Sequence, residues 1–172
     1  YNVDMPETME LRRRMLESKD REQNIGKSIL DFTWLDSVKK NQGEAILFVC
    51  CDVTKYFTTK KLQAFLDAIW QRFPGAEVLF DVKNSVGRKQ ANLKVLTGKK
   101  KGSFIKVSID NCTSLMYDWN IKYRVLYDRA ILNKEDITDM FSDDVARRYR
   151  HAIRRKYDKI IQLRLGTERI QF

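Results

Sequence analysis

The sequence predicts an α/β protein: a mostly parallel sheet with helices on both faces, formed as a single domain over residues 1–172. Two observations support this class. The run 45–51 is continuously apolar instead of alternating, which is typical of a parallel strand covered on both faces. A helical stripe and a second apolar strand, 76–82, follow it, so strand, helix and strand form one crossover unit with a parallel pair.

The chain begins with a strand over residues 1–4 and a helix over residues 7–19. Pro6 stands between them, where the first turn of a helix tolerates proline. A short apolar stretch, 28–32, is interpreted as the next strand; its end carries the acid Asp31, and a brief helical turn follows at 34–38.

A helix laid against a sheet is predicted from Thr58 onward. Its apolar residues recur at the spacing of one wide helical face, and Pro74 and Gly75 end it. The residues of this face are Leu62, Phe65, Leu66, Ile69, Trp70 and Phe73.

The rest of the chain is predicted to hold three more helices, a basic loop and two strands that form an antiparallel edge of the sheet. The helices are 85–96, 112–119 and 143–156, the loop is 99–102, and the strands are 122–127 and 159–165.

The net charge of +10 raises the question of a nucleic-acid partner, since phosphate binding needs clustered Lys and Arg. The clusters are Arg12 to Arg14, Lys99 to Lys101 and the stretch 147–156. Each is also explained as a solvated helix face or loop, and this interpretation is favoured over a nucleic-acid footprint. No apolar run approaches the roughly 20 residues that cross a bilayer, so we expect no membrane partner.

Three cysteines, Cys50, Cys51 and Cys112, form neither a metal-binding pair nor an even disulfide framework. We expect them to be reduced and mostly buried, as in a cytoplasmic protein. The only histidine, His151, lies in an Arg-rich helix and is interpreted as a surface residue and not as a general base.

Three of the early predicted strands end in acids: Asp4, Asp31 and Asp52. Ligands of open α/β sheets lie outside the carboxyl ends of the strands, where an acid can accept hydrogen bonds from ribose hydroxyls or an adenine amino group. Asp is also a common turn and capping residue, and this alternative stays open. No G-x-G, P-loop, H-E-x-x-H or G-x-S-x-G motif occurs in residues 1–172.

Four segments, in this order and spacing, resemble the leucine carboxyl methyltransferase family, in particular the bacterial branch that includes polyketide O-methyltransferases. Residues 1–14 resemble the family's E-V-D-L-P-E-V-x-E-L-R-R, and 28–36 resemble S-x-x-D-x-x-W-L-D. Residues 46–57 are similar to a strand ending in E-G-V-L-x-Y-L, and 73–81 to F-P-G-A-x-x-x-F-D. The match is close to about residue 85 and loose beyond it.

The resemblance implies a class I, Rossmann-like methyltransferase sheet that binds S-adenosyl-L-methionine (SAM). By the same resemblance Asp4 would bind the SAM ribose, and Leu30 with Asp31 would line the adenine pocket. Asp52 would contact the cofactor and, with Tyr56, would lie beside the reaction centre.

Two departures from the family pattern accompany the resemblance. Asp52 stands where the family has Glu, one methylene longer. The family's first strand and glycine-rich turn precede its second strand, and hence would precede Tyr1. We therefore expect residues 1–172 to be an amino-terminally truncated methyltransferase domain, with an acid and a G-x-G upstream.

The predicted function is SAM-dependent O-methylation of a carboxylate or hydroxyl of a small molecule. A carboxylate is slightly favoured, because it needs no general base and the sequence offers no convincing one. Two alternatives stay open: a non-catalytic remnant used for assembly, and a basic nucleic-acid-binding module. Homo-oligomerisation also stays open.

Overall fold

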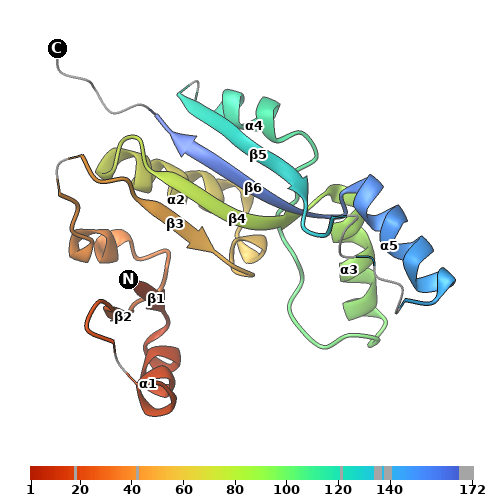
Figure 1. The fold of residues 1–172 in the computed structure, drawn as a ribbon, viewed down its shortest axis with the longest axis horizontal. Coiled ribbons are helices and arrows are strands. Elements are labelled where there is room, and N and C mark those ends of the chain that lie inside the picture. Colours follow the sequence, from red (N-terminus) through yellow and green to blue (C-terminus); the bar gives the residue numbers. More distant parts are fainter. Residues whose placement is uncertain (18, 42, 121, 134–136, 138–140, 167–172) are drawn as a thin grey trace.

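The structure is a computed structural model that describes residues 1–17, 19–41, 43–120, 122–133, 137 and 141–166. The chain first forms a small unit of two parallel strands, β1 (Asn2–Asp4) and β2 (Asn24–Gly26), joined through helix α1 (Pro6–Met15) (Figure 1). Pro6 occupies the first turn of α1, as predicted.

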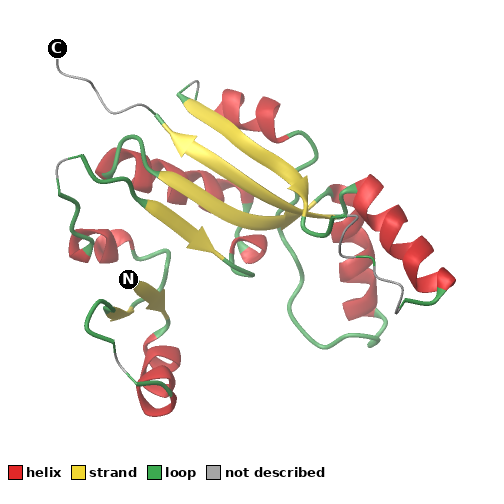
Figure 2. Ribbon diagram, viewed as in Figure 1, coloured by secondary structure: helices red, strands yellow, loops and turns green. Residues whose placement is uncertain are grey.

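The second sheet has four strands in the order β3-β4-β6-β5 (Figure 2). They are β3 (Leu47–Cys50), β4 (Glu77–Lys83), β5 (Tyr123–Ala130) and β6 (Asp158–Leu165). β3 and β4 are parallel, whereas β6 is antiparallel to both β4 and β5. The predicted parallel pair and antiparallel carboxyl-terminal edge are therefore confirmed.

The helices agree closely with the predicted positions. They are α2 (Thr59–Arg72), α3 (Ser85–Leu96), α4 (Cys112–Trp119) and α5 (Asp143–Arg155), with short 3-10 helices η1 (Phe32–Ser37) and η2 (Thr54–Tyr56). Polar caps fix several starts: Thr58 accepts from the N–H of Lys61, Asn84 from Gly87 and Asn111 from Ser114. Among the described helices, none combines the length and the apolar character needed to cross a membrane.

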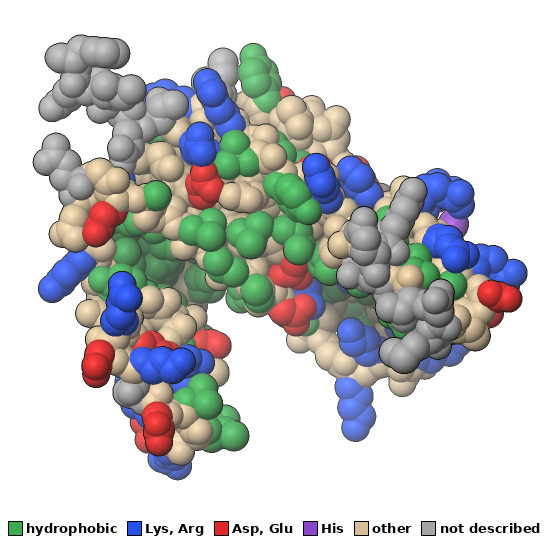
Figure 3. All heavy atoms as spheres, viewed as in Figure 1, with side chains coloured by type: hydrophobic (Ala, Val, Ile, Leu, Met, Phe, Trp, Pro, Cys, Tyr) green, Lys and Arg blue, Asp and Glu red, His purple; other side chains and the backbone are tan. Residues whose placement is uncertain are grey.

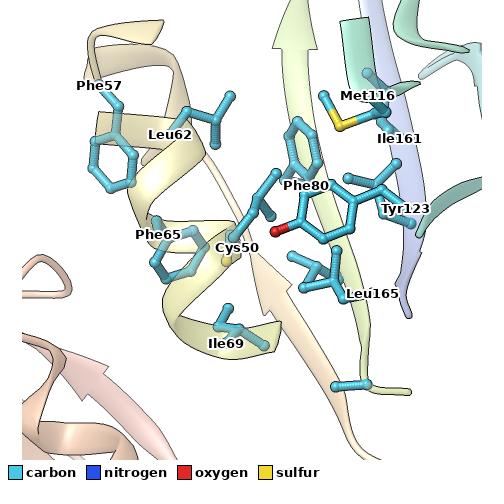
Figure 4. Close-up of a cluster of buried hydrophobic side chains, with 14 of the residues drawn as sticks. Cys50, Phe57, Leu62, Phe65, Ile69, Phe80, Met116, Tyr123, Ile161 and Leu165 are labelled. Atoms are coloured by element: carbon cyan, nitrogen blue, oxygen red, sulfur yellow. The ribbon is translucent and has the colours of Figure 1, made fainter. Parts of the chain in front are cut away.

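The hydrophobic core lies between the four-stranded sheet and the helices α2 and α4 (Figure 4). Phe65 and Ile69 of α2 face Cys50 and Phe80 of the sheet, and Met116 of α4 packs against the same side. Along β4 and β6 every second residue is buried, because alternate side chains of a strand point to opposite faces.

Two early predictions need correction. Residues 28–31 form a turn and not a strand, and β2 lies upstream at Asn24–Gly26. The apolar side chains Ile29 and Leu30 pack against the core from this turn, so their hydrophobicity reflects packing and not a strand. The first helix also ends at Met15 instead of Lys19.

Strand β3 differs from expectation on one face. Leu47 and Val49 are 53% and 57% exposed, although the continuous apolar run predicted burial on both faces. Phe48 and Cys50 point to the covered face, where Phe48 contacts the rings of Trp34 and Phe73. Figure 3 shows hydrophobic side chains gathered on the face of the sheet toward the viewer, with charged side chains around them.

Candidate functional site

The carboxyl ends of the parallel strands β3 and β4 border a pocket of about 280 Å³. Its walls also include residues of α3, the loop that follows α3 and the start of β6. The charged and aromatic residues closest to the strand ends are Asp52, Lys55, Tyr56, Asp81, Lys83 and Asp158. This is the edge where open α/β sheets bind their ligands.

Asp52 has a left-handed backbone conformation, with φ of 61°. For a residue with a side chain this conformation is uncommon and is held by surrounding contacts. The N–H of Asp52 donates a hydrogen bond of 2.5 Å to Oδ1 of Asp81. The hydroxyl of the buried Thr54 donates to the backbone oxygen of Asp81 at 2.9 Å. Both bonds attach the segment after β3 to β4.

Lys55 forms an ion pair with Asp52, and its Nζ lies 5.2 Å from the centre of the Tyr56 ring. Desolvation alone would lower the pKa of Lys55, but the hydrogen bond that Lys55 donates to Asp52 and the nearby negative charges outweigh it, so the pKa is raised. Lys55 is therefore a fixed positive charge at neutral pH and cannot serve as a general base.

The far side of the pocket is formed by the loop after α3, which contains Lys100 and Lys101. The side chain of Asn92 anchors this loop, because it donates to the oxygen of Ile105 at 2.9 Å and accepts from its N–H at 2.8 Å. Lys83 is paired with Asp158. In the part of the chain that the structure describes, Lys100 and Lys101 have no acidic partner, so they add uncompensated positive charge.

Of the predicted site residues, Asp52 and Tyr56 lie together in this pocket. Asp4 is exposed at the end of β1, where its Oδ1 accepts from the N–H of Met5 at 2.7 Å. Asp31 caps η1: Thr33 donates to it from its N–H at 3.2 Å and from its hydroxyl at 2.7 Å. These bonds from Thr33 lower the pKa of Asp31. Leu30 is half-buried beside it. None of these three residues lines the pocket of Asp52.

Sequence reasoning missed four charged residues of the pocket: Lys55, Asp81, Lys83 and Asp158. Asp81 could have been found from the local sequence. The predicted strand 76–82 contains two acids, and Asp81 is the one near its carboxyl end, whereas Glu77 lies near its start. The pair Lys83 and Asp158 is separated by 75 residues, and only the sheet register brings the two together.

The cluster Arg12 to Arg14 is paired with acids, whereas the stretch 147–156 is paired only at its start. Arg12 pairs with Glu22, and Arg13 and Arg14 pair with Glu10. On α5, Arg147 and Arg148 both pair with Asp144. These contacts favour the solvated-surface interpretation for Arg12 to Arg14, and for 147–156 they support it only at Arg147 and Arg148.

No protein-family model matches the sequence, and no curated protein matches it. Solved structures do match the fold. A DUF574 family protein from Streptomyces avermitilis aligns over 96% of this chain and 64% of its own, with a TM-score of 0.59 at 6% identity. An O-methyltransferase family protein from Burkholderia thailandensis aligns over 96% and 43%, with a TM-score of 0.56 at 12% identity.

A third similar structure comes from work on the conversion of a disulfide bond into a thioacetal group during echinomycin biosynthesis. It aligns over 96% of this chain and 66% of its own, with a TM-score of 0.52 at 12% identity. The chain therefore spans between 43% and 66% of the lengths of these three structures. The likeness confirms the predicted fold class. The leucine carboxyl methyltransferase family itself stays a prediction.

Proposed function

We propose that this chain belongs to a SAM-dependent O-methyltransferase whose acceptor is a carboxylate of a small molecule. The observation that carries the proposal is the pocket at the carboxyl ends of β3 and β4, in a fold shared with an O-methyltransferase family protein. The low identities limit that likeness to the fold, so the chemistry is argued from the side chains.

Asp4 at the end of β1 and Asp31 at the start of η1 suit the polar groups of SAM. Asp4 and Asp31 are both exposed, and each uses only Oδ1 for bonds within the described chain, which leaves Oδ2 to accept from a ligand. Asp4 would accept from the ribose hydroxyls, and Asp31 from the adenine amino group with Leu30 against the ring. When bound, SAM supplies an electrophilic methyl group next to a positively charged sulfur. Asp52 and Tyr56 would lie beside that group.

The charges of the pocket favour an anionic acceptor. Lys100 and Lys101 attract and hold an anion, while Ile105 and Ile131 offer apolar contact to its body. Lys55 stays protonated, so it does not remove a proton from a hydroxyl. A carboxylate is already ionised at neutral pH and needs no base. The role of the chain is then to align the acceptor oxygen and to exclude water.

SAM binding is tested by isothermal titration calorimetry on the polypeptide as its gene encodes it. Asp4→Asn removes a charged acceptor, which we expect to weaken SAM binding by about tenfold or more. Asp118→Asn, at an exposed acid of α4, is the matched control and should leave the affinity unchanged. Absence of SAM binding in the unmodified polypeptide would refute the proposal, and equal affinity in Asp4→Asn would refute the assigned ribose contact.

The acceptor class is tested with methyl-labelled SAM and a small-molecule extract of the source cells. A methylated carboxylate is an ester, and mild base releases its label as volatile methanol. A methylated hydroxyl is an ether and keeps its label under the same treatment. A product whose label is stable to base would show that the acceptor is a hydroxyl and not a carboxylate.

A further inference from the structure

Helix α3 and the loop after it carry much of the positive charge of the chain. Between Val82 and Asp110 the sequence has eight Lys and Arg residues and no Asp or Glu. We propose that this segment binds the surface of an anionic lipid bilayer, with α3 lying among the head groups. The expectation of no membrane partner rests on the lack of a spanning run, which a helix on the surface does not need. The inference does not depend on the proposed reaction.

One face of α3 is apolar although it points to solvent. Val86, Leu93 and Leu96 are separated by seven and three residues, which places them on the same side of the helix. They expose 47%, 58% and 73% of their surface, respectively. A single exposed Leu is ordinary, but three large apolar residues on one helical face form a strip that suits a partner.

The other face of α3 is attached to the rest of the molecule. Gly87 lies so close to Tyr157 that a Cβ would be 2.5 Å from its carbonyl oxygen. The side chain of Asn92 makes two hydrogen bonds with the backbone of Ile105. These bonds also hold Phe104, which is 50% exposed, near the helix as a fourth apolar side chain. Figure 1 shows α3 and this loop at the end of the molecule away from α1.

Lysines border the apolar strip. Lys89 and Lys94 stand on α3 beside Leu93, and Lys99 follows the end of the helix; all three are exposed. None of the three has an acidic partner in the described part of the chain, so their charge is available to a ligand. We call the whole set the α3 surface: Val86, Leu93, Leu96 and Phe104 with Lys89, Lys94 and Lys99.

The combination of lysines with aliphatic side chains favours a lipid surface over a nucleic acid. The phosphates of either partner would attract the lysines. A nucleic acid, however, offers bases that stack on aromatic or Arg side chains, and it offers little to Val86, Leu93 and Leu96. At a bilayer these side chains leave water for the acyl-chain boundary, while the lysine stems cover apolar surface and their ammonium groups reach the head groups.

The test measures how the polypeptide as its gene encodes it co-sediments with lipid vesicles. Phosphatidylcholine with about 30% phosphatidylglycerol supplies negative head groups, and phosphatidylcholine alone is the comparison. We expect binding to the anionic vesicles to be about tenfold tighter or more, and to weaken as salt screens the charges. Equal binding to both kinds of vesicle, or binding to neither, would overturn the proposal.

A first pair of double variants tests whether the charge acts at this place. Lys94→Gln with Lys99→Gln should weaken binding to anionic vesicles by about tenfold or more. Arg13→Gln with Arg14→Gln removes the same charge from α1 and should weaken it by less than about threefold. If the two double variants bind equally weakly, the vesicles respond to the net charge of the molecule and the α3 surface is not the binding site.

A second pair tests the apolar contact. Leu93→Gln with Leu96→Gln should weaken binding by about tenfold or more, because less apolar surface leaves water. Leu11→Gln with Met15→Gln, at exposed residues of α1, is the matched control and should leave binding unchanged. All four positions are exposed, so both variants should keep the melting temperature. Unchanged binding after the loss of Leu93 and Leu96 would mean that charge alone is recognised, and the lipid assignment would be wrong.

A fluorophore distinguishes a bilayer from another occupant of the α3 surface. Leu96→Cys is labelled with an environment-sensitive dye in a Cys51→Ser background, because Cys51 is the exposed native cysteine. Anionic vesicles should shift its emission to the blue, and the same dye at Leu11→Cys should not respond. Emission that is already blue-shifted without vesicles would show that a further segment or a second copy covers this surface, which would refute the proposal.

Discussion

The N–H of Asp52 donates a hydrogen bond of 2.5 Å to the carboxylate of Asp81, and this bond holds the residue after β3 against the neighbouring strand β4. Asp52 has a positive φ, which an ordinary side chain adopts only where contacts compensate the strain. The partner on β4 thereby fixes the position from which Lys55 and Tyr56 enter the pocket.

Asp81→Ala should lower the free energy of unfolding by about 1 to 2 kcal/mol, because the N–H of Asp52 loses its acceptor. Asp81→Asn retains Oδ1 as an acceptor and should lower it less. Urea denaturation of the two variants measures the difference. If both variants lose the same free energy of unfolding, the charge of Asp81 stabilises the protein and this hydrogen bond does not.

Gly87→Ala should destabilise the protein, although Ala is ordinarily the better helix residue by about 1 kcal/mol. A Cβ at this position would lie 2.5 Å from the carbonyl oxygen of Tyr157, so helix α3 would have to move away from the start of β6. We expect a loss of about 1 to 3 kcal/mol in the free energy of unfolding. Lys89→Ala, at an exposed residue of the same helix, should change it by less than about 0.5 kcal/mol. A stabilising Gly87→Ala would contradict this packing.

The three cysteines should differ in reactivity. Cys50 and Cys112 are buried and Cys51 is exposed. Burial raises the pKa of Cys50 and of Cys112 to about 12, so both remain protonated thiols at pH 8. Iodoacetamide at pH 8 should modify Cys51 in the folded protein and the other two only after unfolding, as mass spectrometry would show. Rapid labelling of folded Cys51→Ser would be inconsistent with the buried positions.

Asp128→Ala should be strongly destabilising, because it leaves the ammonium of Lys159 buried with no charged partner. Lys159 is 2% exposed, and its Nζ lies 3.0 Å from Oδ2 of Asp128. Removing one partner of such a pair costs about 3 to 5 kcal/mol in the free energy of unfolding. Adding Lys159→Met should recover most of the loss.

The exposed pair of Arg147 and Asp144 provides the comparison for that experiment. Arg147→Ala should change the free energy of unfolding by less than about 1 kcal/mol, since water screens the pair. If Asp128→Ala is as mild as Arg147→Ala, water reaches Lys159 and the interior placement is wrong.

The fold was predictable where the local signals agree. The apolar stripe and the capping residue Thr58 locate α2, and helices α3 and α4 have the predicted bounds. The strand β2 was not predictable, because Asn24–Gly26 is short and half-buried and carries no alternating pattern. The stretch at Ile29 and Leu30 is more hydrophobic, so the strand was predicted there, downstream of its actual position.

The site was predictable only in part. Asp52 was found because it directly follows an apolar strand, and Tyr56 was found only through the family resemblance. Lys83 and Asp158 were missed, since their proximity results from the pairing of β4 with β6 and leaves no local trace in the sequence. Whether Asp4 and Asp31 bind a ligand is likewise a matter of three-dimensional arrangement, and their roles stay predictions.

The position of β6 has a consequence for synthesis on the ribosome. This strand is the last of the described chain, yet it lies between β4 and β5 and pairs with both. The hydrogen bonds between Glu77 and Arg164 can form only after Arg164, 87 residues later in the chain, has been synthesised. A nascent chain that has emerged only to α5 therefore has β4 and β5 unjoined, and the sheet closes only once β6 has been synthesised.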